Sequence, residues 1–129
     1  MNILKNILKT IALFAIVFAC TNNSTSLQEN DRNELDQLQT EIELLISEGK
    51  CTENAACDFI AFGNKPCGGP WRYLVYSTSI NVETLKIKVT AFNTKEASYN
   101  KKWGIASDCM AVLPPLDAEC IDGVCSAIY

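Results

Sequence analysis

The chain contains no histidine. Without it, neither a Ser-His-Asp nor a Cys-His catalytic arrangement can form, and the commonest general base near neutral pH is missing. The sequence also lacks a basic cluster, because 11 Lys and Arg against 15 Asp and Glu leave a formal net charge of −4. That balance argues against nucleic acid as a partner. We therefore predict no catalytic residue and no cofactor, and an enzymatic activity is the less favoured interpretation.

The sequence also lacks a long apolar run. The longest, from Ile11 to Ala19, has nine residues, whereas a helix that crosses a bilayer needs roughly 20. It follows the basic residues Lys5 and Lys9 and precedes a cysteine, which is the order of an export signal. We predict that residues 1–19 are a signal peptide and that the protein leaves the cytoplasm.

The residues at the end of this run are Val17, Phe18, Ala19 and Cys20, followed by a polar stretch. They resemble the lipobox of bacterial lipoproteins. The resemblance implies cleavage before Cys20, a thioether-linked diacylglycerol on its sulfur, and acylation of the new amino terminus with a fatty acid such as palmitate. Two or more acyl chains hold a protein stably on a membrane. The alternative is that Cys20 is discarded with the signal peptide.

The expected location is the cell envelope, outside the cytoplasm. Removal of Lys5 and Lys9 leaves nine basic and fifteen acidic residues, so the lipid rather than surface charge must hold the protein to the membrane. Thr21 is not acidic, as a residue that retains lipoproteins at the inner membrane would be. In a bacterium with two membranes we therefore expect the outer membrane.

Six cysteines remain in the exported part, and we expect all six to form disulfides: Cys51, Cys57, Cys67, Cys109, Cys120 and Cys125. The compartment is oxidising. A zinc site would favour close Cys-x2-Cys pairs and some histidine, whereas the intervening stretches here have five, nine, 41, ten and four residues. We predict no metal. Six cysteines allow 15 pairings, and the sequence does not select among them.

The rest of the chain predicts a polar flexible tether over residues 20–30 and a single cysteine-rich α+β domain over residues 31–129. Apolar residues at steps of three and four predict a first helix that starts at Asn30 or Asp31, has a capping box with Glu34, and stops at Gly49. The apolar residues of this helix are Leu35, Leu38, Ile42 and Leu45.

A second helix is predicted over residues 82–103, capped by Asn81 and ended by Gly104. Its β-branched residues leave a strand over Thr84 to Phe92 as the alternative. After Gly104 the pattern changes to period two and turns, and Asp122-Gly123 is a strong hairpin signal. We expect a C-terminal antiparallel sheet of two or three strands, with Cys120 and Cys125 opposite each other or on one face.

Between the helices, a loop runs from Gly63 to Pro70 and is followed by Trp71, Arg72 and Tyr73. The structural interpretation is that the glycines supply special backbone angles and Trp71 packs over a disulfide. The functional one is that the loop presents these three residues to a protein or glycan, because Trp, Tyr and Arg are the usual anchors of interfaces. Together with Ser107-Asp108-Cys109 and the terminal Cys-x4-Cys, the loop resembles small exported bacterial cysteine-rich domains of unassigned activity.

Three acidic residues, Asp117, Glu119 and Asp122, cluster near the predicted hairpin. They could touch a calcium ion, but an acidic turn more often serves as a solvated edge. The function we expect is a non-enzymatic binding module. The alternatives are a small hydrolase that uses carboxylates and a purely structural envelope lipoprotein.

Overall fold

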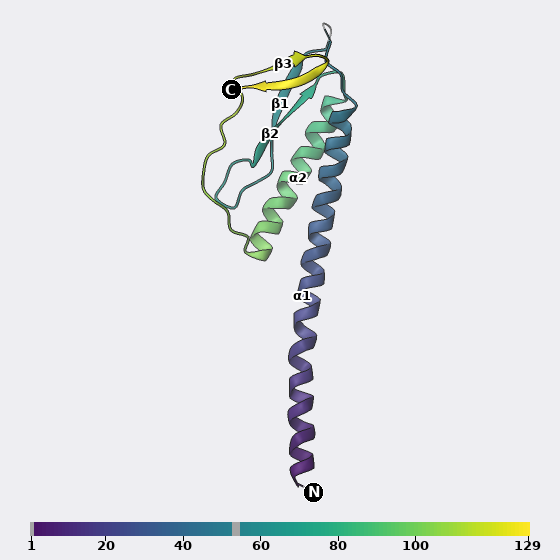
Figure 1. Cartoon of the computed structure of the whole chain (residues 1–129), viewed down its shortest axis with the longest axis vertical. Coiled ribbons are helices and arrows are strands. Elements are labelled where there is room, and N and C mark those ends of the chain that lie inside the picture. The colour runs from purple at the N-terminus through teal and green to yellow at the C-terminus, as the bar shows by residue number, and fades with distance from the viewer. Residues whose placement is uncertain (1, 53–54) are drawn as a thin grey trace. The chain divides into compact units, whose positions relative to one another are not determined.

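The structure, a computed structural model, describes residues 2–52 and 55–129, with side chains described from residue 24 onward (Figure 1). In these residues the elements follow in the order helix, hairpin, helix, hairpin. They are α1 (Asn2–Ser47), β1 (Cys57–Phe62), β2 (Arg72–Ser77), α2 (Val82–Trp103), β3 (Asp117–Ile121) and β4 (Val124–Ile128). The predicted α+β class is confirmed.

Helix α1 does not begin where the sequence pattern predicted. The start at Asn30 or Asp31 is wrong, because the described backbone is helical from Asn2, and residues 24–30 are helical rather than irregular. The polar composition of residues 20–30 suggested a tether. However, the first glycine is Gly49 and the first proline is Pro66, so no helix-breaking residue occurs before Gly49.

The chain divides into two compact units, Met1–Asn33 and Glu34–Tyr129. The predicted lipidation site, Cys20, lies outside the residues whose side chains are described. Over the described residues, no helix combines the length and the apolar character needed to cross a membrane.

Gly49 follows the last turn of α1, and its N–H donates to the carbonyl of Ile46 at 3.1 Å. A Cβ at this position would lie 2.8 Å from Cγ2 of Ile80. Glycine is needed here because two chain segments come close, rather than because the backbone is left-handed.

Helix α2 matches its predicted bounds, and the alternative strand over Thr84 to Phe92 is wrong. The side chain of Asn81 accepts a hydrogen bond from the N–H of Thr84 at 2.9 Å. Gly104, with φ of 61°, ends the helix in the left-handed region and donates to the carbonyl of Asn100. Local signals at both ends therefore outweigh the strand propensity of the residues between them.

Strands β1 and β2 form an antiparallel hairpin around the glycine-proline loop. Alternate residues face opposite sides of the sheet. One side carries Phe62 and Tyr76, which belong to the buried hydrophobic core, and Ile60 and Leu74, which pack against it. The run after Trp71 is thus an extended strand.

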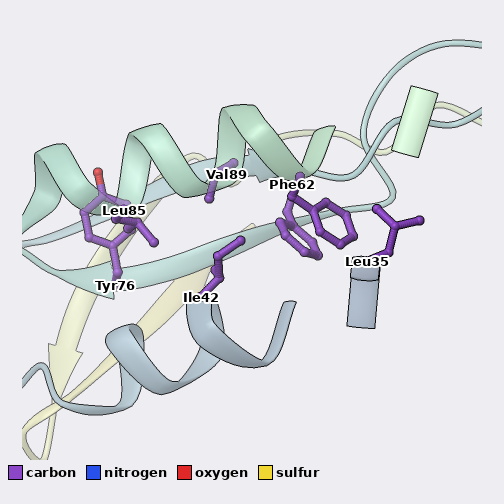
Figure 2. Packing of buried hydrophobic residues seen from close by; sticks show 7 residues of the cluster. Leu35, Ile42, Phe62, Tyr76, Leu85 and Val89 are labelled. Atoms are coloured by element: carbon purple, nitrogen blue, oxygen red, sulfur yellow. The ribbon is translucent and has the colours of Figure 1, made fainter. Parts of the chain in front are cut away.

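The core lies between the C-terminal turns of α1, the β1–β2 hairpin and α2 (Figure 2). Ile42 and Leu85 are fully buried, and the rings of Phe62 and Phe92 stack with centroids 4.3 Å apart. The hydroxyl of Tyr76 donates to Oδ2 of Asp58 at 3.0 Å. Burial, together with this bond to a carboxylate, raises the pKa of Tyr76 to about 12.

The C-terminal segment forms one hairpin, β3–β4, so two of the two or three predicted C-terminal strands are present. Asp122 and Gly123 have φ values of 51° and 81°, as a type I′ turn requires. Residues 105–116 form no strand, although their pattern has period two. Met110 and Leu113 are about three-quarters exposed, so this alternation does not correspond to a buried face.

Two isoleucines provide a matched test of the core. Ile42→Ala should lower the free energy of unfolding by about 2–5 kcal/mol, because it leaves a cavity at a fully buried position. Ile87→Ala, on α2 at 61% exposure, should change it by less than about 0.5 kcal/mol. Equilibrium denaturation measures both, and equal effects would contradict the packing of α1 against α2.

Candidate functional site

The loop between β1 and β2 has a backbone that only glycine adopts readily. Gly63, Gly68 and Gly69 have φ values of 86°, 95° and 82°. Inside the loop the N–H of Gly68 donates to the carbonyl of Lys65 at 2.8 Å, and the N–H of Lys65 donates to the carbonyl of Gly69 at 2.9 Å. The loop is therefore a closed, hydrogen-bonded turn.

Polar side chains of α2 hold the start of this loop. Oδ1 of Asn93 accepts from the N–H of Gly63 at 2.7 Å, and Oε2 of Glu96 accepts from the N–H of Asn64 at 2.5 Å. Asn100, which is buried, donates to the carbonyl of Asn64 at 2.7 Å. Sequence analysis missed these three residues, although their spacing of three and four beside the apolar stripe places them on one side of the helix.

Lys65 is the one charged residue of the loop, and its side chain is only 6% exposed. Its Nζ donates to Oδ1 of Asp108 and to the carbonyl of Met110, each at 3.0 Å, and lies 5.1 Å from the ring centroid of Trp71. A buried charge is tolerated only with such partners. The hydrogen bond from Lys65, and then that from the N–H of Met110, lowers the pKa of Asp108.

A disulfide between Cys67 and Cys109 joins the same two segments two residues farther along the loop. We call the group of Lys65, Cys67, Asp108 and Cys109 the clasp. It ties the loop to the segment after α2 by one covalent bond and by one ion pair between the buried Lys65 and the exposed Asp108. The segment carries Met110, which is 75% exposed, so the clasp fixes the backbone beside an apolar side chain in solvent.

Trp71 follows the loop and lies against Gly63. A Cβ on Gly63 would fall 2.4 Å from Cδ1 of the indole, so any larger residue there would displace the ring. The structural interpretation placed Trp71 over a disulfide, whereas the ring contacts that the structure shows are with Gly63 and Lys65. The side chain remains 39% exposed.

Arg72 and Tyr73 have separate partners on opposite sides of β2. Nη2 of Arg72 donates to Oε1 of Glu43 at 2.8 Å, and its guanidinium lies 5.3 Å from the ring centroid of Phe62. Tyr73 packs edge-on against Phe59 with centroids 5.9 Å apart. Of the three predicted binding residues, Arg72 and Tyr73 therefore point to opposite faces of β2, and Trp71 precedes the strand.

All six predicted disulfide cysteines are paired, as Cys51–Cys120, Cys57–Cys125 and Cys67–Cys109. The Sγ atoms of Cys51, Cys57 and Cys125 lie within 4.8 Å of one another. Each of them is bonded to another sulfur, so this cluster offers no thiolate to a metal. Within the described part of the chain, Asp117, Glu119 and Asp122 do not converge on a common point as metal ligands would.

Two glycines of the loop test the contact with Trp71. Gly63→Ala combines a positive φ with a steric clash, and it should lower the free energy of unfolding by about 2–4 kcal/mol. Gly68→Ala also places a side chain at a positive φ, but its Cβ would lie in open space. The free energy of unfolding should therefore fall by only about 1–2 kcal/mol. Denaturation followed by tryptophan fluorescence distinguishes them, and equal losses would show that Trp71 does not rest on Gly63.

Comparison of the chain with protein-family models, with curated proteins and with solved structures finds no match. Its function is therefore inferred from its own residues and contacts.

Proposed function

We propose that this chain is a bacterial lipoprotein, held in the cell envelope by lipid on Cys20, whose domain is a non-enzymatic binding module for a protein or glycan. The export signal and the lipobox-like residues support the anchor. The three disulfides of the domain also support export, because such bonds persist in oxidising compartments and are rare in the cytosol.

The observation that carries the binding role is the exposed indole of Trp71 beside a loop fixed by the clasp. Tryptophan is among the residues that most often dominate binding energy at interfaces. A loop already held by a disulfide, an ion pair of the buried Lys65 and three side chains of α2 loses little conformational freedom when a partner binds. Rigidity and an exposed aromatic group together favour recognition.

The titratable groups give an enzymatic role less support. A general acid near neutral pH needs a carboxyl group with a raised pKa. The pKa of Asp108 is lowered by its bonds within the clasp, and that of Glu43 is lowered by hydrogen bonds from Gln39 and Arg72. The hydrogen bonds therefore keep both carboxyl groups in the charged form, in ion pairs that hold elements together.

The anchor is tested by the intact mass of material purified from membranes. We expect the mass of residues 20–129 plus a diacylglyceryl group and an amide-linked acyl chain. Cys20→Ala should abolish the lipid and the cleavage, since the thioether has no sulfur to form on. The double variant Cys67→Ala, Cys109→Ala is the matched control and should be lipidated normally. An unmodified chain that retains residues 1–19 would refute the anchor.

The binding role is tested with Trp71→Ala in the full chain, solubilised in detergent and incubated with native envelope extracts. Loss of a central interface tryptophan should weaken partner capture by about tenfold or more. Ile87→Ala, which removes another exposed apolar side chain, should leave it unchanged. Circular dichroism checks the fold. If the folded Trp71→Ala protein keeps every interaction of the parent, the loop is not the binding site.

A further inference from the structure

The β3–β4 hairpin has two faces with different surroundings. Cross-strand pairs alternate between the faces. One face carries Cys120 opposite Cys125 and Ala118 opposite Ala127. The other, which we call the outer face, carries Asp117, Glu119, Ile121, Val124, Ser126 and Ile128.

The two cysteines decide which face points toward the rest of the domain. Cys120 is bonded to Cys51, and Cys125 is bonded to Cys57 at the start of β1. Strand β3 lies close to β1, and β4 lies close to β2 (Figure 1). The two disulfides therefore tie the cysteine face to Cys51 and to the start of β1. On the outer face, four of the six residues are exposed, and Ser126 and Ile128 are partly buried.

The outer face combines exposed aliphatic side chains with negative charge. Ile121 and Val124, opposite each other next to the turn, are 49% and 65% exposed. Asp117 and Glu119 project from the same face and are also exposed, and Asp122 lies in the turn. The sequence holds no lysine or arginine after Lys102, so this segment supplies no basic residue of its own to balance the charge.

The carboxylates in the ion pairs of the domain belong to other elements. The described pairs use Glu34, Glu41 and Glu43 of α1 and Asp108 of the clasp. Asp117 and Glu119 are in none of these described pairs, although Oδ1 of Asp117 accepts a hydrogen bond from the N–H of Ala118 at 2.7 Å. Both can pair with an external cation, beside apolar groups that a partner could cover.

We propose that the outer face binds a basic, aliphatic segment of another protein. Lysine or arginine side chains of the partner pair with Asp117 and Glu119, while its aliphatic side chains cover Ile121 and Val124. Complementary charge of this kind speeds encounter and selects partners. Nucleic acid and anionic lipid are repelled, and a second copy docked through the same face would bring like carboxylates together.

The disulfides make this face a suitable docking surface. An isolated two-stranded hairpin is marginally stable in water. Here the adjacent cystines hold both strands in place before a partner arrives, so binding does not have to order them. This surface is separate from Trp71 and the clasp, so the two proposals can fail independently.

The test uses the full chain, ¹⁵N-labelled, in micelles of an uncharged detergent. The probe is a synthetic ten-residue peptide that alternates lysine with valine and has blocked ends. The control is the same peptide with every lysine replaced by glutamate. We expect the lysine peptide to shift the amide resonances of residues 117–128, and the affinity to fall as salt is added. The glutamate peptide should cause no shift.

Two charge reversals locate the interaction. Glu119→Lys should weaken binding of the lysine peptide about tenfold, because it replaces an attractive charge with a repulsive one. Glu48→Lys makes the same change at an exposed position just after α1 and should alter the affinity less than twofold. Intact mass without free thiols would confirm that each variant keeps the disulfides of Cys120 and Cys125, which hold the hairpin.

Several results would overturn the proposal. One is no binding of the lysine peptide, and another is equal binding of both peptides, which would mean that contact is apolar only. Shifts confined to residues outside 117–128 would place the basic site elsewhere. Concentration-dependent association of the chain with itself that Glu119→Lys abolishes would make the occupant a second copy instead.

Discussion

The three disulfides are the constraint on which the segment after α2, residues 104–129, depends. Each joins a cysteine between residues 51 and 67 to one between residues 109 and 125. Among the described residues, every member of the hydrophobic core lies before Trp103. The segment after α2 therefore has little apolar burial to hold it, and the covalent bonds take that role. Bonds that close loops of 42 to 69 residues stabilise by about 4 kcal/mol each in the chain-entropy estimate.

This difference between packing by apolar burial and fixation by disulfides explains where the exposed apolar side chains lie. The helices and the first hairpin pack most of their apolar residues against one another. The segment after α2, which the disulfides hold, exposes Met110, Leu113, Leu116, Ile121, Val124 and Tyr129. A segment that is fixed by bonds rather than by burial can show apolar groups to solvent without losing its shape. Both proposed interaction surfaces, the loop with Trp71 and the outer face of β3–β4, adjoin such bonds.

In the clasp, one charged residue links the packed part of the domain to the segment after α2. Lys65 comes from a loop held by α2, and its partners Asp108 and Met110 lie on the segment after α2. The cost of burying its charge is offset by the ion pair, the carbonyl and the face of Trp71. The sequence offered no sign of this, because the two ion-pair partners are 43 residues apart.

Two patterns that are local in the chain predicted the structure correctly. The bounds and caps of α2 follow from Asn81, Gly104 and an apolar period near 3.6, and the turn of β3–β4 follows from Asp122-Gly123, because both depend on backbone geometry over a few residues. The start of the first helix was misjudged for the converse reason. A polar composition does not stop a helix when no glycine or proline is present, so Asp31 lies within α1 rather than at its end.

The sequence by itself determined which residues could form helices, which turn could close a hairpin, and that six cysteines were available for pairing. Only the tertiary structure decided which of the 15 pairings forms, which face of β3–β4 is covered, and that Trp71 rests on Gly63. These outcomes depend on contacts between residues far apart in the chain. Such contacts are set by how the elements pack, and composition and spacing carry no record of that packing.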